Sequence, residues 1–252
     1  MISVVLLGAG NVAYHFYNAF KNAEGVTISQ WYNRTTQNII KYQNEVDICK
    51  NINELKEADI YLIAVSDDAI AKLSSKIPFT DKLVVHTSGS LNVHELDRKN
   101  RRGVFYPLQT FSKDVDIDFK NVPICLEVID KSDFKTLKQI AEEIHSPSYR
   151  ISTEQRQTLH LAAVYVNNFT NQLYRIAHEI TDIKNINFKI LKPLILETAK
   201  KIQNVSPYMA QTGPAKRGDK KTIKKHLKLL EDEIHKDIYT LLTKAIQDTH
   251  GK

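Results

Sequence analysis

The order of apolar and polar positions divides this 252-residue chain into two parts. In the first part, short apolar runs alternate with segments of helical periodicity. The runs predict strands at residues 4–8, 26–32, 46–48, 58–65, 82–90, 103–111 and 122–128. A predicted helix at residues 132–144 ends this part. Strands that alternate with helices indicate an α/β fold with a mostly parallel sheet.

From Ser152 onward the strand signals disappear, and the apolar positions follow a helical period. This pattern predicts three long helices, at residues 153–181, 187–204 and 219–247. The first is apolar nearly all round, as a buried central helix would be. The second part of the chain is therefore expected to be all-helical.

A glycine turn follows the first strand and opens a helix, with the pattern Gly-x-Gly-x-x-Ala from Gly8 to Ala13. The first glycine permits the tight turn, the second lets backbone N–H groups approach a pyrophosphate, and the alanine allows close helix packing. The helix N-terminus then offers unpaired donors and partial positive charge to the anion. The alternative is a tight turn without a ligand. The predicted phosphate-binding residues are Gly8, Ala9, Gly10, Asn11 and Val12.

The second strand ends in Asn33, Arg34 and Thr35, with no acidic residue. A site specific for NAD places Asp or Glu there to bind the ribose 2′-hydroxyl, whereas Arg accommodates a 2′-phosphate. Arg34 can also stack on adenine, and the threonine hydroxyl can donate a hydrogen bond. Although an exposed arginine in a turn would give the same sequence, the missing carboxylate favours NADP over NAD.

Two later strands deliver polar residues to the same edge of the predicted sheet. Ligands of a doubly wound sheet sit beyond the carboxyl ends of its strands. We therefore expect Val65, Ser66, Asp67 and His86 to border the cofactor, and Ser88 to lie nearby. Together these patterns predict two domains. The first is a Rossmann-type domain with a mostly parallel sheet over residues 1–151, and the second is an all-helical domain over residues 152–252.

A line of polar residues crosses the otherwise apolar helix at residues 153–181. Its members lie on one helical face: His160, Asn167, Asn171, Tyr174 and His178. Buried amides and imidazoles need partners. For His160 and Asn167 a role facing a ligand and a structural role both remain open, whereas a structural role is favoured for His178.

Charge and composition narrow the choice of partners. Much of the net charge of +6 comes from residues 216–228, where no aromatic residue is interleaved for base stacking. We therefore expect no nucleic-acid partner, and interpret this run as a solvated helix face or a basic rim for an anionic ligand. No segment approaches the length of a membrane span, so we expect a cytoplasmic protein. Cys49 and Cys125 are expected to be reduced structural thiols, and no metal site is predicted.

The chain resembles a known family through motifs that occur in order along it: Gly8-x-Gly10-x-x-Ala13, Asn33-Arg34, Val65-Ser66-Asp67, His86-Thr87-Ser88-Gly89, residues 106–111, 160–168 and 212–219. It is similar to Rossmann-like proteins with a DUF2520 C-terminal domain, relatives of pyrroline-5-carboxylate reductase, of the F420-dependent NADP oxidoreductases and of the 6-phosphogluconate dehydrogenase-like superfamily. This resemblance implies an NADP-binding domain joined to a helical domain that makes a homodimer, with an active cleft between the two.

The chain departs from these relatives at two places. The family pattern has His where this sequence has Tyr106, and no Lys occurs between Thr158 and Arg175, where related hydroxyacid dehydrogenases use one. The predicted catalytic residues are therefore His160, Asn168, Tyr106 and Ser88. We expect an NADP-dependent oxidoreductase acting on a small carbonyl or imine; the alternative is a non-catalytic NADP sensor or interaction protein.

Overall fold

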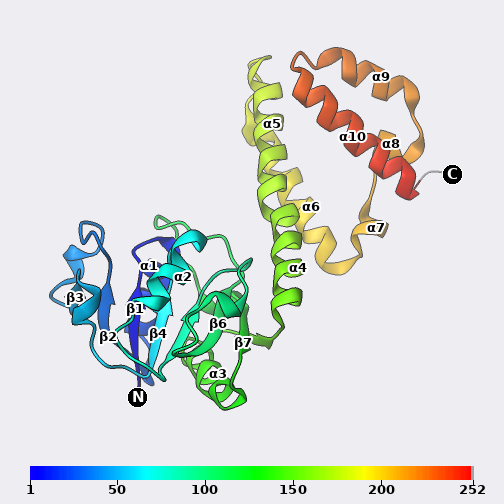
Figure 1. Cartoon of the computed structure of the whole chain (residues 1–252). Coiled ribbons are helices and arrows are strands. Elements are labelled where there is room, and N and C mark those ends of the chain that lie inside the picture. Colours follow the sequence, from blue (N-terminus) through cyan, green and yellow to red (C-terminus); the bar gives the residue numbers. More distant parts are fainter. Residues whose placement is uncertain (251–252) are drawn as a thin grey trace. The chain divides into compact units, whose positions relative to one another are not determined.

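The computed structural model describes residues 1–250 (Figure 1). The chain divides into two compact units, residues 1–167 and 168–252. The boundary predicted at residues 151 and 152 lies just before helix α4 (Thr153–Ala163), whereas the compact units divide between Asn167 and Asn168.

The first unit is built on an eight-stranded sheet with the order β3-β2-β1-β4-β5-β6-β7-β8. The strands are β1 (Ile2–Leu7), β2 (Val26–Tyr32), β3 (Ile48–Cys49), β4 (Ile60–Ile63), β5 (Leu83–His86), β6 (Arg101–Pro107), β7 (Ile124–Val128) and β8 (Ser148–Arg150). All neighbouring pairs are parallel except β6 and β7. The predicted Rossmann-type, mostly parallel sheet is confirmed. Strand β8 was not predicted, because three residues of mixed polarity carry no strand periodicity.

Helices pack on the sheet, and short 3₁₀ helices occupy the connections. The helices of the first unit are α1 (Asn11–Lys21), α2 (Asp67–Ser75), α3 (Phe134–Glu143) and α4, with 3₁₀ helices η1 (Ile40–Tyr42), η2 (Ile52–Glu54), η3 (Val93–Glu95), η4 (Phe119–Asn121) and η5 (Lys131–Asp133).

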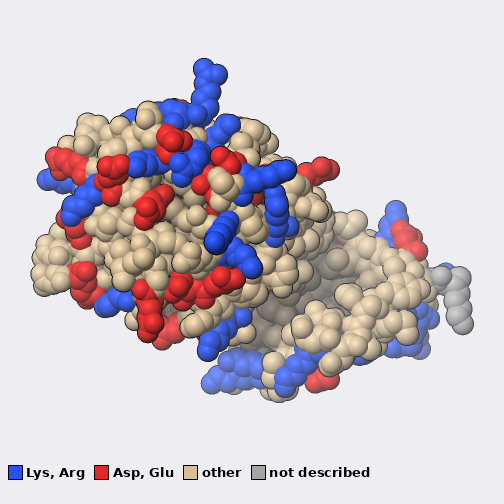
Figure 2. Space-filling model, turned by 90° about the horizontal axis from the view of Figure 1, so that it is seen from below, with Lys and Arg blue, Asp and Glu red and all other residues tan. Residues whose placement is uncertain are grey.

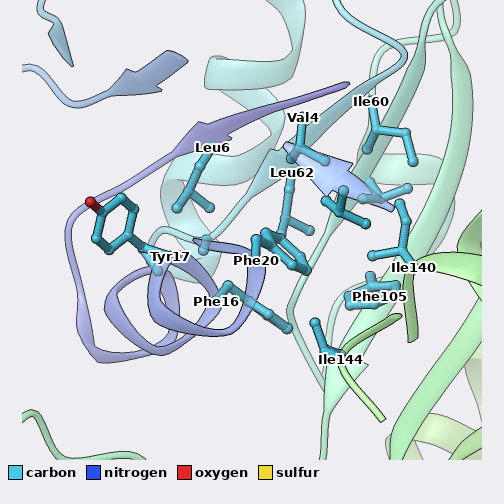
Figure 3. Packing of buried hydrophobic residues seen from close by; sticks show 14 of the residues in the cluster. Val4, Leu6, Phe16, Tyr17, Phe20, Ile60, Leu62, Phe105, Ile140 and Ile144 are labelled. Carbon is cyan, nitrogen blue, oxygen red and sulfur yellow. The ribbon is translucent and has the colours of Figure 1, made fainter. Parts of the chain in front are cut away.

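Strand β1 is buried on both faces, which explains its unbroken apolar run. Val4 and Leu6 point to one core with Phe16 and Phe20 of α1, as Figure 3 shows. Val5 and Leu7 point to a second core on the opposite face, together with Ile70 of α2. Because both faces are covered, the carboxyl end of the strand is held rigidly where the glycine turn begins.

The second unit is helical, as predicted. Its elements are α5 (Thr170–Asp182), η7 (Phe188–Leu191), α6 (Lys192–Asn204), α7 (Pro207–Ala210), α8 (Pro214–Arg217), α9 (Lys220–Leu229) and α10 (Glu233–His250). Helix α4 continues into α5 through a π-helical segment, η6 (Val164–Phe169).

Two helix predictions need correction. The single helix expected over residues 219–247 is broken between α9 and α10, because Leu230 is extended and the Asp232 side chain accepts the His235 N–H, which begins a new helix. The helix over residues 153–181 is not buried within one chain. Leu161, Val166 and Phe169 are 59%, 73% and 50% exposed.

No helix within residues 1–250 is both long and apolar enough to cross a membrane. Within the same residues, no group of three or more His, Cys, Asp or Glu side chains is arranged to hold a metal ion. Figure 2 shows basic and acidic side chains interspersed over the face of the molecule that it draws.

Candidate functional site

A cavity of about 770 Å³ lies in the first unit, at the carboxyl ends of β1, β2 and β4. In the sheet, β1 lies between β2 and β4, so the strand order reverses direction at β1. Doubly wound sheets bind ligands at this switch point. We call it the switch-point cavity. Its lining residues are Ala9, Gly10, Asn11, Val12, Tyr32, Asn33, Arg34, Asn38, Ala64, Val65, Ser66, Ala69, Lys72, Leu73, Lys76, Thr87, Gln109 and Phe111.

The two glycines of the turn do different work. Gly8 has φ +125°, and a Cβ atom built there would lie 2.1 Å from the carbonyl oxygen of Ala64. Its backbone carbonyl accepts the indole N–H of Trp31 at 2.6 Å. Gly8 is therefore required by the fold and lies buried behind the cavity lining.

Gly10 precedes α1 as its N-cap, and a Cβ built there would meet nothing within 4 Å. The fold itself therefore does not require a glycine here, but the open space allows a ligand to approach the backbone. No side chain caps α1, and no acidic residue occupies its first turn. The free N–H groups and the helix dipole are left to attract an anion.

The end of β2 places Asn33 and Arg34 in the cavity lining. Thr35 lies outside the lining but orders the turn, since its backbone carbonyl accepts the Asn33 side-chain amide at 2.6 Å. Arg34 is exposed and enters no ion pair among residues 1–250.

Val65 and Ser66 also line the cavity, whereas Asp67 and His86 do not. The Asp67 carboxylate accepts the Ser90 hydroxyl. His86 is fully buried, and its Nδ1 accepts the Ser88 N–H at 3.1 Å. Burial and the nearby Arg156 guanidinium lower the pKa of His86 to about 4, so the ring is neutral at physiological pH.

Outside the cavity lining, Tyr106 of β6 contacts His160 of α4. The Tyr106 hydroxyl lies 3.2 Å from His160 Nδ1, and the rings are arranged edge to face. Burial raises the pKa of Tyr106 to about 12, so the hydroxyl keeps its proton at neutral pH. It can form a hydrogen bond with Nδ1 without losing that proton. We call these two residues the Tyr106–His160 pair.

Gly89 lies against this pair, and a Cβ built there would come within 2.7 Å of His160 Nδ1 and 2.8 Å of Tyr106 Cζ. The preceding residue, Ser88, is buried, and its hydroxyl accepts the N–H groups of Ser90 and Leu91 at 3.1 and 3.0 Å. The structure thus brings together three predicted catalytic residues through one turn. The fourth, Asn168, is exposed and is the first residue of the second unit.

The cavity and the pair adjoin along the chain. Thr87 lines the cavity one residue before Ser88, and Gln109 lines it three residues after Tyr106. Two short stretches of chain therefore link the cavity lining to the Tyr106–His160 pair.

Comparison with known proteins shows the family to which the chain belongs. Residues 122–246 match the model of a domain of unknown function, DUF2520. A Bacteroides fragilis protein, provisionally named an NADP oxidoreductase, is 37% identical with a TM-score of 0.89, and the match covers 98% of each chain. The chain belongs to the DUF2520 family. No curated protein matched it.

More distant structures share the fold of this DUF2520 protein. An imine reductase from Myxococcus stipitatus, solved with NADP⁺, is 16% identical with a TM-score of 0.70, over 99% of this chain and 96% of that one. Pyrroline carboxylate reductase from Plasmodium falciparum, solved with NADP bound, is 15% identical with a TM-score of 0.60, over 99% and 97% of the two chains.

The sequence analysis missed the ion pair that anchors α4. Arg156 is fully buried and pairs with Glu127 of β7, and its guanidinium also donates to the Leu91 carbonyl. The Thr153 N–H and hydroxyl donate to the same carboxylate at 2.9 and 2.8 Å. These bonds fix the first turn of α4 on β7, and His160 follows Arg156 by one helical turn.

Two signals in this DUF2520 sequence could have revealed the anchor. Glu127 is a charged residue inside an otherwise apolar strand, and such a residue needs a partner when the strand is buried. Ser152 and Gln155 form a capping box that marks the start of α4 and places Arg156 in its first turn. The other missed residues, Asn38, Lys72 and Lys76, line the cavity from segments with no recognised motif.

Proposed function

We propose that this protein is an NADP-dependent oxidoreductase that moves a hydride between C4 of the nicotinamide and a small carbonyl or imine compound. The observation that carries the proposal is an acid-free cavity at the sheet switch point, whose lining is linked by two short stretches of chain to the Tyr106–His160 pair. The cavity volume of about 770 Å³ is in the range of cofactor sites. The known structures named above, two of them solved with NADP or NADP⁺, support the same assignment.

The lining residues suit each part of such a cofactor. The N–H groups of residues 10–12 would hold the pyrophosphate, because the first turn of α1 is uncapped. Arg34 would hold the adenosine 2′-phosphate, since it enters no ion pair among the described residues, 1–250, and no acid lines the cavity. Val65 and Ser66 would border the cofactor at the end of β4. When bound, the cofactor supplies or accepts the hydride.

The chain must then move one proton. When the substrate carbon gains a hydride, its oxygen or nitrogen gains a proton from an acid of the protein. We assign this role to His160. As the acid, His160 would be the imidazolium: its Nδ1–H would donate to the Tyr106 oxygen, and its Nε2 would give a proton to the substrate and leave a neutral ring protonated on Nδ1.

A second candidate is a sensor that binds NADP without turnover. Tyr106 favours it, since the pKa of about 12 makes this hydroxyl a weak acid at neutral pH where the family pattern has His. The oxidoreductase and the sensor would bind the same cofactor and differ only in whether they transfer a hydride.

We further propose that the functional unit is a homodimer. Exposed apolar side chains follow the continuous helix from α4 to α5: Leu161, Tyr165, Val166, Phe169, Leu173 and Ile180. We call this set the apolar stripe. Its exposure is costly at about 25 cal/mol per Å², and a second copy of the chain would cover it.

Cofactor binding is tested by titrating the protein with NADPH and NADH. The proposal predicts at least about tenfold tighter binding of NADPH, about 1.4 kcal/mol. In the Arg34→Ala variant most of this preference should disappear, because the guanidinium no longer pairs with the extra phosphate. Equal affinities of the unmodified protein for both nucleotides would contradict the assignment.

A further inference from the structure

The lining of the switch-point cavity is strongly cationic. It contains Arg34, Lys72 and Lys76, and no Asp or Glu. Arg34 follows the end of β2 by two residues, whereas Lys72 lies on α2 and Lys76 is the C-cap of that helix, on the other side of the glycine turn. Three positive charges therefore converge on one cavity from two separate elements.

Helix α2 presents these lysines through its own periodicity. Ile70 and Ser74 are buried and face the sheet. Ala69, Lys72, Leu73 and Lys76 line the cavity, and their spacing of three and four places them on one helical face. The two apolar members can pack against a flat ring, and the two lysines, four residues apart, add charge on the same face.

Neither lysine is neutralised by the protein. Lys72 and Lys76 enter none of the ion pairs within residues 1–250. Asp68 lies four residues before Lys72, yet the two do not pair, and the Asp67 carboxylate is occupied by Ser90. Three cations without counterions repel each other, so the cavity is suited to an anion with more than one charge.

NADP and NAD differ in one group that fits this excess. Both carry the pyrophosphate, for which the uncapped first turn of α1 is available. NADP adds a 2′-phosphate of about −1.5 to −2 charge at neutral pH. Arg34 alone would leave about a third to a half of that charge unpaired.

Building on the proposed function, we infer that Lys72 and Lys76 of α2 join Arg34 in binding the 2′-phosphate, and that they are specificity-determining residues for NADP over NAD. Lysine acts on phosphate as a mobile point charge, whereas Arg34 can bind it through two parallel hydrogen bonds. The discrimination is therefore shared between the end of β2 and a helix that follows β4.

The test measures Kd for NADPH, NADH and 2′,5′-ADP with the full chain. Its variants are Lys72→Gln, Lys76→Gln and the double variant. Both side chains are exposed, so folding should be unchanged, and a melting curve checks this. Lys120→Gln is the matched control, since it removes one exposed charge outside the cavity lining.

We expect the double variant to bind NADPH and 2′,5′-ADP at least about tenfold more weakly, while its Kd for NADH changes less than about threefold. The variant with both Lys72→Arg and Lys76→Arg keeps both positive charges, so it should retain the preference for NADPH over NADH. Equal weakening of NADPH and NADH would overturn the inference, because the lysines would then serve a shared part of both nucleotides. No weakening at all would also overturn it.

The same titration separates this inference from the proposal beneath it. If the unmodified protein prefers NADPH and the variants keep that preference, only the role of the lysines is wrong. If the unmodified protein binds neither nucleotide, the proposed cofactor is wrong and the inference falls with it.

Discussion

The Tyr106 hydroxyl lies 3.2 Å from Nδ1 of His160, although the two residues are 54 positions apart. Strand β6 supplies one and helix α4 the other, and a glycine at position 89 leaves the space in which they meet. A side chain at 89 would separate the rings, so this contact depends on the turn between them.

If His160 moves the proton, the variant His160→Gln should lose turnover by a factor on the order of a hundred or more. Affinity for NADPH should stay nearly unchanged, because the glycine turn and Arg34 are intact. Tyr106→Phe is the companion variant. It should lower turnover less than His160→Gln does, because it removes only the hydrogen bond to Nδ1. Rate, affinity and melting temperature are measured on the same preparation.

A purely structural His160 gives the reverse result. The lost hydrogen bond would then lower the free energy of unfolding by about 1–3 kcal/mol, with turnover per folded molecule preserved.

The two glycines of the turn should respond oppositely to alanine. Gly8→Ala places a methyl group against the Ala64 carbonyl at a positive φ, so the protein should be destabilised or fail to fold. Gly10→Ala meets no protein atom within 4 Å and should fold normally. It should nevertheless bind NADPH at least about tenfold more weakly, since the methyl group occupies space needed by the phosphate. If a folded Gly10→Ala protein bound NADPH normally, the glycine turn would not be part of the cofactor site.

His86 makes stability depend on pH. Its pKa is lowered to about 4 in the folded chain, against 6.5 ordinarily, because burial disfavours the charged ring. Between these values the unfolded chain binds the extra proton, so stability falls as pH drops from 6.5 toward 4. The loss should be on the order of 3 kcal/mol.

Urea unfolding at pH 7 and pH 4.5 measures this effect, with the variant His86→Leu as reference. The unmodified protein should lose more stability than the variant over this interval. The same pH dependence in both proteins would show that His86 does not carry the effect.

Dimerisation predicts a light-scattering mass of about twice 28.9 kDa. The variant Val166→Asp places a charge in the apolar stripe at a position 73% exposed in one chain, so it should fold and remain monomeric. Val115→Asp, at a position 57% exposed outside the stripe, serves as control and should remain dimeric. A monomeric unmodified protein at micromolar concentration would contradict the proposal.

Local sequence was sufficient for features set by neighbouring residues. The buried strand β1, the Gly8 turn and the start of α1 follow from a run of adjacent residues, and each was predicted correctly. The start of α9 has the same local origin, because the side chain of Asp219, directly before the helix, accepts the Thr222 N–H.

Features that depend on distant residues escaped prediction. The Arg156–Glu127 pair joins positions 29 residues apart, and periodicity cannot show that a helix arginine lies on a strand glutamate. Lys72 and Lys76 have the sequence pattern of an ordinary solvated helix face, and only the sheet order brings them to the same cavity as Arg34. The break between α9 and α10 was hidden because the apolar spacing continues across it.

We propose above that this DUF2520 protein moves a hydride between the nicotinamide of NADP and a small carbonyl or imine compound. The most direct measurement follows the absorbance of NADPH and of NADH in the presence of the unmodified protein and a panel of such compounds. We predict consumption of NADPH by at least one compound, at least about tenfold faster than that of NADH at equal subsaturating concentrations. Tight NADPH binding with no consumption across the panel would contradict the claim and favour the sensor.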